Sequence, residues 1–259
     1  MQSETLIYIM IYAYIFIFGV CIGSFTNVLI YRIPLQENIA TKSSHCMSCG
    51  KKIKWYDLVP LVSYIILRGR CRHCKAKISV QYPLVEFISG IGYVLIFLTN
   101  GINLPSLIFC LSFSCLVVIS VIDWRTYEIY NCMIYALLAL AVIRVIYEAI
   151  TDYHSIPEYV IGFFAVSTIL FIIYKASHER AMGLGDVYLM AAGGLLLGWK
   201  HIILALVIGA VIGSVIHYIL MLVLKKDHML ALGPYLSAGM FITMLFGDGI
   251  LAWYWQFFK

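Results

Sequence analysis

Long apolar runs separated by short polar stretches make up most of this chain. Eight runs are predicted to be membrane-spanning helices: residues 6–30, 84–100, 104–122, 130–150, 157–174, 187–199, 201–224 and 229–255. About 20 apolar residues cross a bilayer as a helix, and a helix satisfies its own backbone hydrogen bonds in lipid. The sixth run is short and rich in glycine, so we expect it either to tilt or to run nearly straight into the seventh.

One polar stretch, 34–83, is long enough to form a domain outside the membrane. The chain is therefore predicted to have three parts: a first transmembrane helix at 1–33, a cytoplasmic insert at 34–83 and a membrane domain of seven helices at 84–259. The predicted fold is an all-α polytopic membrane protein. The first run has no basic start and no cleavage motif after it, so we expect it to remain as a helix.

Composition and charge agree with this organisation. The chain is 63% hydrophobic and 12% charged, whereas soluble domains have about 45–50% apolar and about 25% charged residues. With the N-terminus outside, the cytoplasmic loops hold all of the 18 Lys and Arg residues except Arg144, Lys200 and Lys259. Basic loops mark the cytoplasmic side. Because these charges form no basic stripe, nucleic-acid binding is not expected.

The insert carries two cysteine pairs, Cys46-x-x-Cys49 and Cys71-x-x-Cys74, and Gly50 follows the first pair. This spacing is typical of a tetrahedral zinc site with four thiolates, which would stabilise a segment too small for a large core. A redox dithiol and two disulfides are the alternatives, although a cytoplasmic location disfavours stable disulfides. We expect a structural Zn²⁺.

Two aspartates lie at the ends of predicted spans. Asp123 ends the third span and Asp186 opens the sixth, and the predicted topology puts both at the cytoplasmic face. Ionisable groups at membrane depth indicate function, and paired carboxylates suit general acid–base chemistry on water. The alternatives are that Asp186, after Gly183 and Gly185, caps a helix, and that Asp123 pairs with Arg125 at the interface.

Several motifs, in the same order, resemble those of the type IV prepilin peptidases, a bacterial family of GxGD aspartic proteases. They are Gly23-Ser24-Phe25-Thr26-Asn27 with Tyr31-Arg32-Ile33-Pro34, the double CxxC with Leu67-Arg68-Gly69-Arg70-Cys71-Arg72, Tyr82-Pro83-Leu84-Val85-Glu86, Asp123 with Ile129, Gly183–Asp186, and Gly233-Pro234-Tyr235. The chain departs from the family at two positions. Tyr130 stands where a proline is usual, and Tyr188 where a lysine is frequent.

The resemblance implies an endopeptidase of the inner membrane with Asp123 and Asp186 as its catalytic residues. Its substrates would be prepilins or pseudopilins, from which it removes a short basic leader at the cytoplasmic face. It also allows methylation of the new N-terminus with S-adenosylmethionine, although no residue spacing in this chain demonstrates a nucleotide-like pocket.

Two other classes of function fit the same aspartates or cysteines. A proton- or cation-coupled transporter could use intramembrane acids and glycine-broken helices, but the chain shows no inverted repeat and both acids lie at one face. A non-enzymatic assembly scaffold could use the four-cysteine insert for docking. Substitution of the aspartates separates both alternatives from the peptidase.

Overall fold

The computed structural model of the protein describes residues 2–39, 41, 43–178, 182–224 and 231–257. Within these ranges the chain is helical, and its only β-type pairings are two isolated bridges in the insert. It divides into two compact units, Met1–Leu98 and Thr99–Lys259, which we describe separately. The three-part organisation at 1–33, 34–83 and 84–259 stays a prediction. Five basic residues used to predict the topology lie outside the described residues: Lys42, Arg180, Lys225, Lys226 and Lys259.

The first unit contains two long helices, α1 (Gln2–Arg32) and α3 (Gln81–Asn100). They approach closely at Gly23, where a Cβ atom would lie only 2.8 Å from the Cα atom of Glu86. Small residues allow helices to pack at this distance in a membrane. One turn after Asn27, the ring of Tyr31 stacks on that of Tyr82, with centroids 5.2 Å apart. The insert begins after the end of α1 and ends at the start of α3, where these two helices lie side by side.

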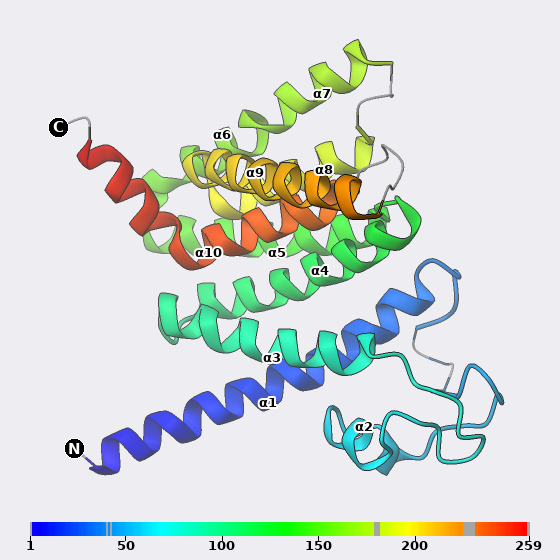
Figure 1. The fold of residues 1–259 in the computed structure, drawn as a ribbon. Coiled ribbons are helices and arrows are strands. Elements are labelled where there is room, and N and C mark those ends of the chain that lie inside the picture. Colours follow the sequence, from blue (N-terminus) through cyan, green and yellow to red (C-terminus); the bar gives the residue numbers. More distant parts are fainter. Residues whose placement is uncertain (1, 40, 42, 179–181, 225–230, 258–259) are drawn as a thin grey trace. The chain divides into compact units, whose positions relative to one another are not determined.

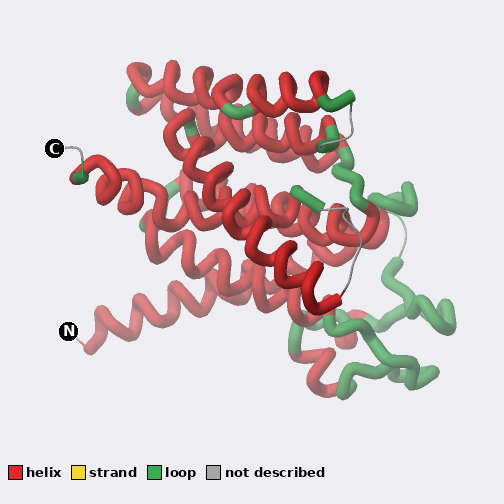
Figure 2. The backbone as a smooth tube through the Cα atoms, turned by 45° about the horizontal axis from the view of Figure 1, so that its top comes forward, coloured by secondary structure: helices red, strands yellow, loops and turns green. Residues whose placement is uncertain are grey.

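Among its described residues, the insert has two short helical segments, η1 (Trp55–Asp57) and α2 (Val62–Ile66). Figure 2 shows the other described residues of the insert, up to the start of α3, as loop. The Arg72 guanidinium forms a bidentate pair with Asp57, with Nε–Oδ2 at 2.9 Å and Nη2–Oδ1 at 2.6 Å. This hydrogen bonding from Arg72 holds the pKa of Asp57 below its ordinary value. The pair ties the second cysteine motif to η1.

The second unit consists of α4 (Leu104–Thr126), α5 (Asn131–Thr151), η2 (Tyr153–Ser155), α6 (Ile156–Ala165), α7 (Ser167–Ala176), α8 (Leu184–Leu197), α9 (Trp199–Leu224) and α10 (Gly233–Gln256). In Figure 1, α4 ends and α5, α8 and α10 begin at the same end of this unit, on the right. Helix α8 is central, since it contacts α5, α6, α7, α9 and α10. At its crossing with α6, the backbones of Gly162 and Gly194 leave no room for a Cβ atom.

The predicted spans correspond to helices, with local differences. Among the described residues, seven helical spans are long and apolar enough to cross a membrane, and α8 is a shorter apolar helix. The fifth predicted span is divided at Val166 into α6 and α7, where the Ser167 hydroxyl donates to the carbonyl oxygen of Phe163. Such a side-chain bond to the preceding turn often bends a helix. The predicted start of the last span, at Met229, lies outside the described residues, and α10 begins at Gly233.

Helices α8 and α9 are separate, so the sixth span does not run on into the seventh. Gly198 between them has a φ of +84°, a conformation that glycine adopts without steric cost. Its N–H donates to the carbonyl oxygen of Gly194 at 2.9 Å and so closes the last turn of α8. The chain then turns back, and α9 packs against α8.

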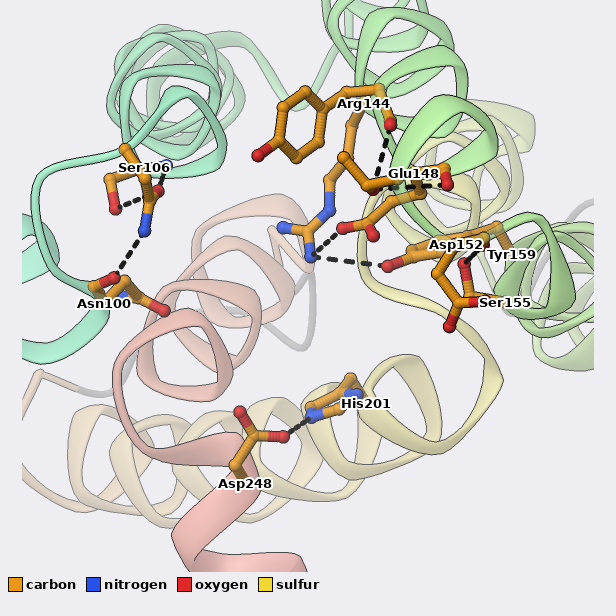
Figure 3. Close-up of polar contacts among 12 residues, drawn as sticks. Asn100, Ser106, Arg144, Glu148, Asp152, Ser155, Tyr159, His201 and Asp248 are labelled. Carbon is orange, nitrogen blue, oxygen red and sulfur yellow. Dashed lines mark hydrogen bonds and ion pairs between the residues drawn. The ribbon is translucent and has the colours of Figure 1, made fainter.

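Polar contacts join the helices at the other end of the second unit (Figure 3). Nη2 of Arg144 lies 3.4 Å from both Oε1 of Glu148 and the hydroxyl of Tyr159, which links α5 to α6. Nε2 of His201 lies 3.0 Å from Oδ1 of Asp248, which links α9 to α10. The contacts with Glu148 and Tyr159 give the charged Arg144 side chain polar partners within a membrane span, where a charge needs them.

Candidate active site and metal site

Asp123 lies in the last turn of α4 and is 5% exposed. Its Oδ2 atom accepts a hydrogen bond from the backbone N–H of Gly233 at 2.8 Å. Gly233 is the first residue of α10, where unsatisfied N–H groups and the helix dipole favour a negative charge. A Cβ atom at position 233 would lie 2.7 Å from the same oxygen. Glycine is therefore the residue that lets this backbone donor reach the carboxylate.

We expect Gly233→Ala to lower the activity of the site by about 10- to 100-fold without unfolding the protein. The added methyl group displaces the Asp123 carboxylate, and misplacement by about 1 Å can cost about 100-fold. The cleavage activity that the sequence resemblance implies, together with the melting temperature in detergent, would measure the two effects.

Gly249→Ala is the matched control, because it changes the same helix at a position where a Cβ atom meets nothing within 4 Å. Equal activities of the two alanine variants would show that the Gly233 donor does not position Asp123.

Asp186 is the third residue of α8 and is 7% exposed. Its Oδ2 atom accepts from the backbone N–H of Gly183 at 3.3 Å. Oδ1 is buried and has no hydrogen-bond partner among the described residues. The alternative that Asp186 is the N-cap is wrong, because Gly183 holds that position and Asp186 supports it from the third residue. One carboxylate oxygen therefore holds the helix start, and the other remains available to a reacting group.

The two aspartates are neighbours. They come from α4 and α8, whose ends meet at one side of the second unit (Figure 1), and the charge of Asp123 acts on Asp186. Carboxylates whose charges interact in this way disfavour being ionised together. The arrangement can therefore supply one general base and one general acid.

The loop between α4 and α5 packs against the start of α8. A Cβ atom on Gly185 would lie 2.8 Å from the Cβ atom of Ile129. This close approach brings Asp186 to the side of the bundle on which α4 ends. Gly185 thus allows the loop between α4 and α5 to approach the start of α8 closely. Tyr188 is 45% exposed, and no described contact explains why it replaces the usual lysine.

Tyr130, in place of the usual proline, is the N-cap of α5, with φ −81° and ψ 127°. Proline adopts this φ, and the Tyr130 N–H makes none of the backbone hydrogen bonds of the described loops. We expect Tyr130→Pro to keep the fold and to stabilise it by roughly 0.4–1 kcal/mol, because proline restricts the unfolded chain.

The melting temperature of the Tyr130→Pro protein in detergent checks this expectation. Leu137→Pro, in the interior of α5, is the contrasting variant and is expected to cost about 3 kcal/mol or more. Similar destabilisation by both prolines would contradict the backbone argument.

The four insert cysteines lie together. All four Sγ atoms are within 4.8 Å of one another, and those of Cys46 and Cys74 are 3.8 Å apart. Four sulfurs at about 2.3 Å from a tetrahedral zinc are about 3.8 Å from each other, whereas disulfide sulfurs are bonded at about 2.05 Å. All four are free thiols in the structure. The donor set therefore fits a metal ion such as Zn²⁺.

The two cysteine pairs have the same local geometry. Backbone N–H groups of Gly50 and Lys75 donate to the carbonyl oxygens of Cys46 and Cys71, at 2.8 and 3.0 Å. Gly50 has a φ of +68°, as expected for a tight turn after the first pair, and Lys75 has a φ of +61°. The second turn is thus made without glycine.

The thiols differ in acidity. Backbone N–H groups of Cys49 and then Ser48 stabilise the Cys46 thiolate and lower the pKa of Cys46 to about 6. The Ala76 N–H acts in the same direction on Cys74, but desolvation and the other three thiols outweigh it and raise the pKa of Cys74 to about 11. A metal ion would bind Cys46 as an existing thiolate and displace the proton of Cys74, so acid should weaken binding.

Comparisons with known proteins cover both units. The model of the type IV leader peptidase family matches residues 110–218, which include Asp123 and Asp186. The model of the bacterial Peptidase A24 N-terminal domain matches residues 17–100, which include the four cysteines. The chain belongs to the type IV leader peptidase family. The resemblance seen in the sequence motifs is confirmed, and the helical, multi-pass architecture agrees with it.

Several known proteins share moderate sequence identity with this chain. A protein from Myxococcus xanthus (strain DK1622) is 32% identical over 81% of this chain and 63% of its own length. One from Aeromonas hydrophila is 29% identical over 94% of this chain and 93% of its own, and one from Pseudomonas putida is 28% identical over 91% of each. All three are named prepilin leader peptidase/N-methyltransferase. No solved structure matches the chain.

Proposed function

We propose that this protein is an aspartic endopeptidase that removes the short basic leader of type IV prepilins or pseudopilins. The observation that carries the proposal is the pair of buried, neighbouring carboxylates, Asp123 and Asp186, each held by a backbone N–H group. The names of the relatives support the class of substrate. They give no support to the transporter alternative.

In the proposed mechanism, one carboxylate takes a proton from a water molecule as it attacks the scissile carbonyl carbon. The other carboxyl group is protonated and donates to the carbonyl oxygen, which stabilises the charge that develops there. Both groups are buried, and electrostatic effects are stronger at buried positions than in bulk water. The free Oδ1 atom of Asp186 is suited to contact the reacting water or carbonyl.

The basic loops support an orientation in which the N-terminus is outside and the aspartates face the cytoplasm. In this orientation, the leader of the substrate meets the site from the cytoplasm while its apolar helix remains in the bilayer. Cys46, Cys49, Cys71 and Cys74 would hold a structural Zn²⁺ in the cytoplasmic insert. Four thiolates leave no open coordination position, so catalysis by the metal is not part of this proposal.

A second activity follows from the names of the relatives: methylation of the new N-terminus. When bound, S-adenosylmethionine would supply an electrophilic methyl group on a sulfonium. That methyl group would pass to the new N-terminal amine, with S-adenosylhomocysteine as the second product and a proton released to water.

The test is to incubate the purified chain in lipid nanodiscs with a candidate prepilin and to follow the masses of the products. We expect the free leader and the mature pilin from the wild type, and neither from the Asp123→Asn/Asp186→Asn double variant. Addition of S-adenosylmethionine should raise the mass of the mature product by one methyl group.

The same assay separates the rival classes. A scaffold would leave prepilins intact whether or not the aspartates are present, while cysteine substitutions would disrupt partner binding. A transporter would show aspartate-dependent ion flux into proteoliposomes without any processing of prepilin. Either pattern would overturn the peptidase proposal.

A further inference from the structure

Helix α2 of the insert has a polar side chain directed inward and apolar side chains directed outward. Val62, Ile65 and Ile66 are 50, 73 and 68% exposed. Ser63 is buried, and its hydroxyl donates to the carbonyl oxygen of Tyr56 at 3.2 Å. A helix on the surface of a soluble domain has the opposite arrangement. Exposed apolar surface of this kind marks a contact with a membrane or with another protein.

Trp55 enlarges this apolar surface. It lies in η1, which contacts α2, and it is 80% exposed. Tryptophan is enriched at the level of the lipid headgroups, because its ring is apolar and its N–H group is polar. Trp55, Val62, Ile65 and Ile66 are called the apolar surface of the insert below.

The apolar surface lies near the first turns of a membrane helix. Leu61, the residue before α2, donates its backbone N–H to Oε2 of Glu86 at 2.8 Å. Glu86 is the sixth residue of α3, a helix long and apolar enough to cross a membrane, and Figure 1 shows α2 at this end of α3. At about 1.5 Å per residue, Glu86 lies about 8 Å along α3. Helices that lie in a membrane interface bury their apolar side chains to a similar depth, about 5–10 Å.

A cavity of about 580 Å³ adjoins the end of α2. Its apolar wall is made by Ile66 and Leu67, and its charged wall by Arg68, Arg70, Arg72 and Lys75. Arg72 pairs with Asp57. The other three cations are exposed and form no ion pair with a carboxylate of the described residues. The cavity therefore offers positive charge beside the apolar surface.

We propose that the insert binds anionic phospholipid of the leaflet next to it. The apolar surface enters the boundary between headgroups and acyl chains, and Arg68, Arg70 and Lys75 bind the headgroup phosphates. An apolar helix face with adjoining basic residues is the combination that holds interfacial helices on anionic membranes. The inference goes beyond the proposed cleavage of prepilins and does not depend on it.

Anionic lipid matches both halves of this site. A free anion would contact the cations but would leave Val62 and Ile65 in water. A basic prepilin leader would be repelled by the charges that line the cavity. Lipid is also always within reach, because the membrane helices α1 and α3 precede and follow the insert.

Photolabelling in nanodiscs tests the apolar contact. The full, metal-loaded chain is placed in phosphatidylcholine with phosphatidylglycerol, part of which carries a photoreactive group near the start of an acyl chain. We expect label on residues 62–66 and on the membrane spans, which show that the reagent works. Ile65→Asp/Ile66→Asp should lower the label on residues 62–66 about ten-fold or more, because charged side chains are costly among acyl chains. The label on the spans should not change.

Titration of a phosphatidylglycerol with a fluorescent acyl chain into the full chain, in neutral detergent, tests the cations. We expect the wild type to bind it more tightly than the phosphatidylcholine analogue. Arg68→Gln/Arg70→Gln should weaken binding about ten-fold or more, because each basic group adds to the attraction. Arg68→Lys/Arg70→Lys keeps both charges and is the matched control, which should bind nearly as the wild type does. Metal content and melting temperature confirm that both variants are folded.

Two results with the wild type would overturn the proposal whether or not the variants fold: residues 62–66 without lipid label, and equal affinity for the two lipids. Equal weakening in the folded glutamine and lysine variants would also overturn it. Inorganic phosphate that binds as tightly as the lipid would assign the cavity to free anions instead. Residues 62–66 that take no lipid label but become protected from a water-soluble label when prepilin is added would assign the apolar surface to the substrate.

Discussion

Replacing either Asp123 or Asp186 by asparagine is expected to reduce leader removal by at least about 10³-fold. Asparagine keeps the size of the side chain and an acceptor for the backbone donors, but it can neither take nor give the proton that the reaction needs. Because the two groups act as a unit, the double variant should be hardly slower than either single variant. Single-turnover cleavage of a prepilin, followed by mass spectrometry, measures all three.

Asp248→Asn is the matched control for these variants. Asp248 also lies on a helix of the second unit, but its side chain is 98% exposed and pairs with His201 at the other end. It should retain wild-type cleavage. All variants must melt like the wild type in detergent. If a folded single aspartate variant kept a tenth or more of the activity, that aspartate would not be a proton carrier in the reaction.

The second large effect concerns the metal. We expect one Zn²⁺ per chain and expect a strong chelator to unfold the insert, because structural zinc contributes of the order of 10 kcal/mol to small domains. Cys46→Ser should lose the metal and expose residues 34–83 to trypsin at least 100-fold faster. Metal content by mass spectrometry and limited proteolysis measure both outcomes. Lower pH should make the chelator more effective, since protons compete for the thiolates.

Cys132→Ser is the control, because Cys132 is an exposed cysteine of α5 outside the insert. Its metal content and proteolysis should equal those of the wild type. A metal-free wild type whose intact mass shows two disulfides would contradict the zinc site. Metal content that is unchanged in Cys46→Ser would exclude that thiol from it.

The sequence predicted the membrane helices and the meeting of the two aspartates well, because both depend on patterns that side chains display. Apolar runs of bilayer length have few alternatives to helix. Two predicted spans separate Asp123 from Asp186, and an even number of crossings returns the chain to the same side. The four cysteines likewise have a spacing that is seldom compatible with another site.

Contacts made by backbone groups were harder to predict from the sequence. The donor to Asp123 is the main-chain N–H of Gly233, more than a hundred residues away along the chain, and hydropathy gives no signal of such a contact. The fifth apolar run continues through Val166, so hydropathy gives no signal of the division there. The glycine motif before Tyr235 was seen in the sequence, but its role became visible only when α10 was placed beside α4.

The length of α8 has a consequence for the depth at which the carboxylates lie. Its 14 residues rise about 21 Å, at about 1.5 Å per residue, whereas the hydrocarbon core of a bilayer is about 30 Å thick. A helix this short covers about two thirds of that thickness. Because other helices of the unit pack around α8, the difference in length leaves at least one of its ends inside the bundle, below the level of the headgroups. Asp186 is in its first turn, so water can approach the carboxylates at a depth that a full-length span would seal.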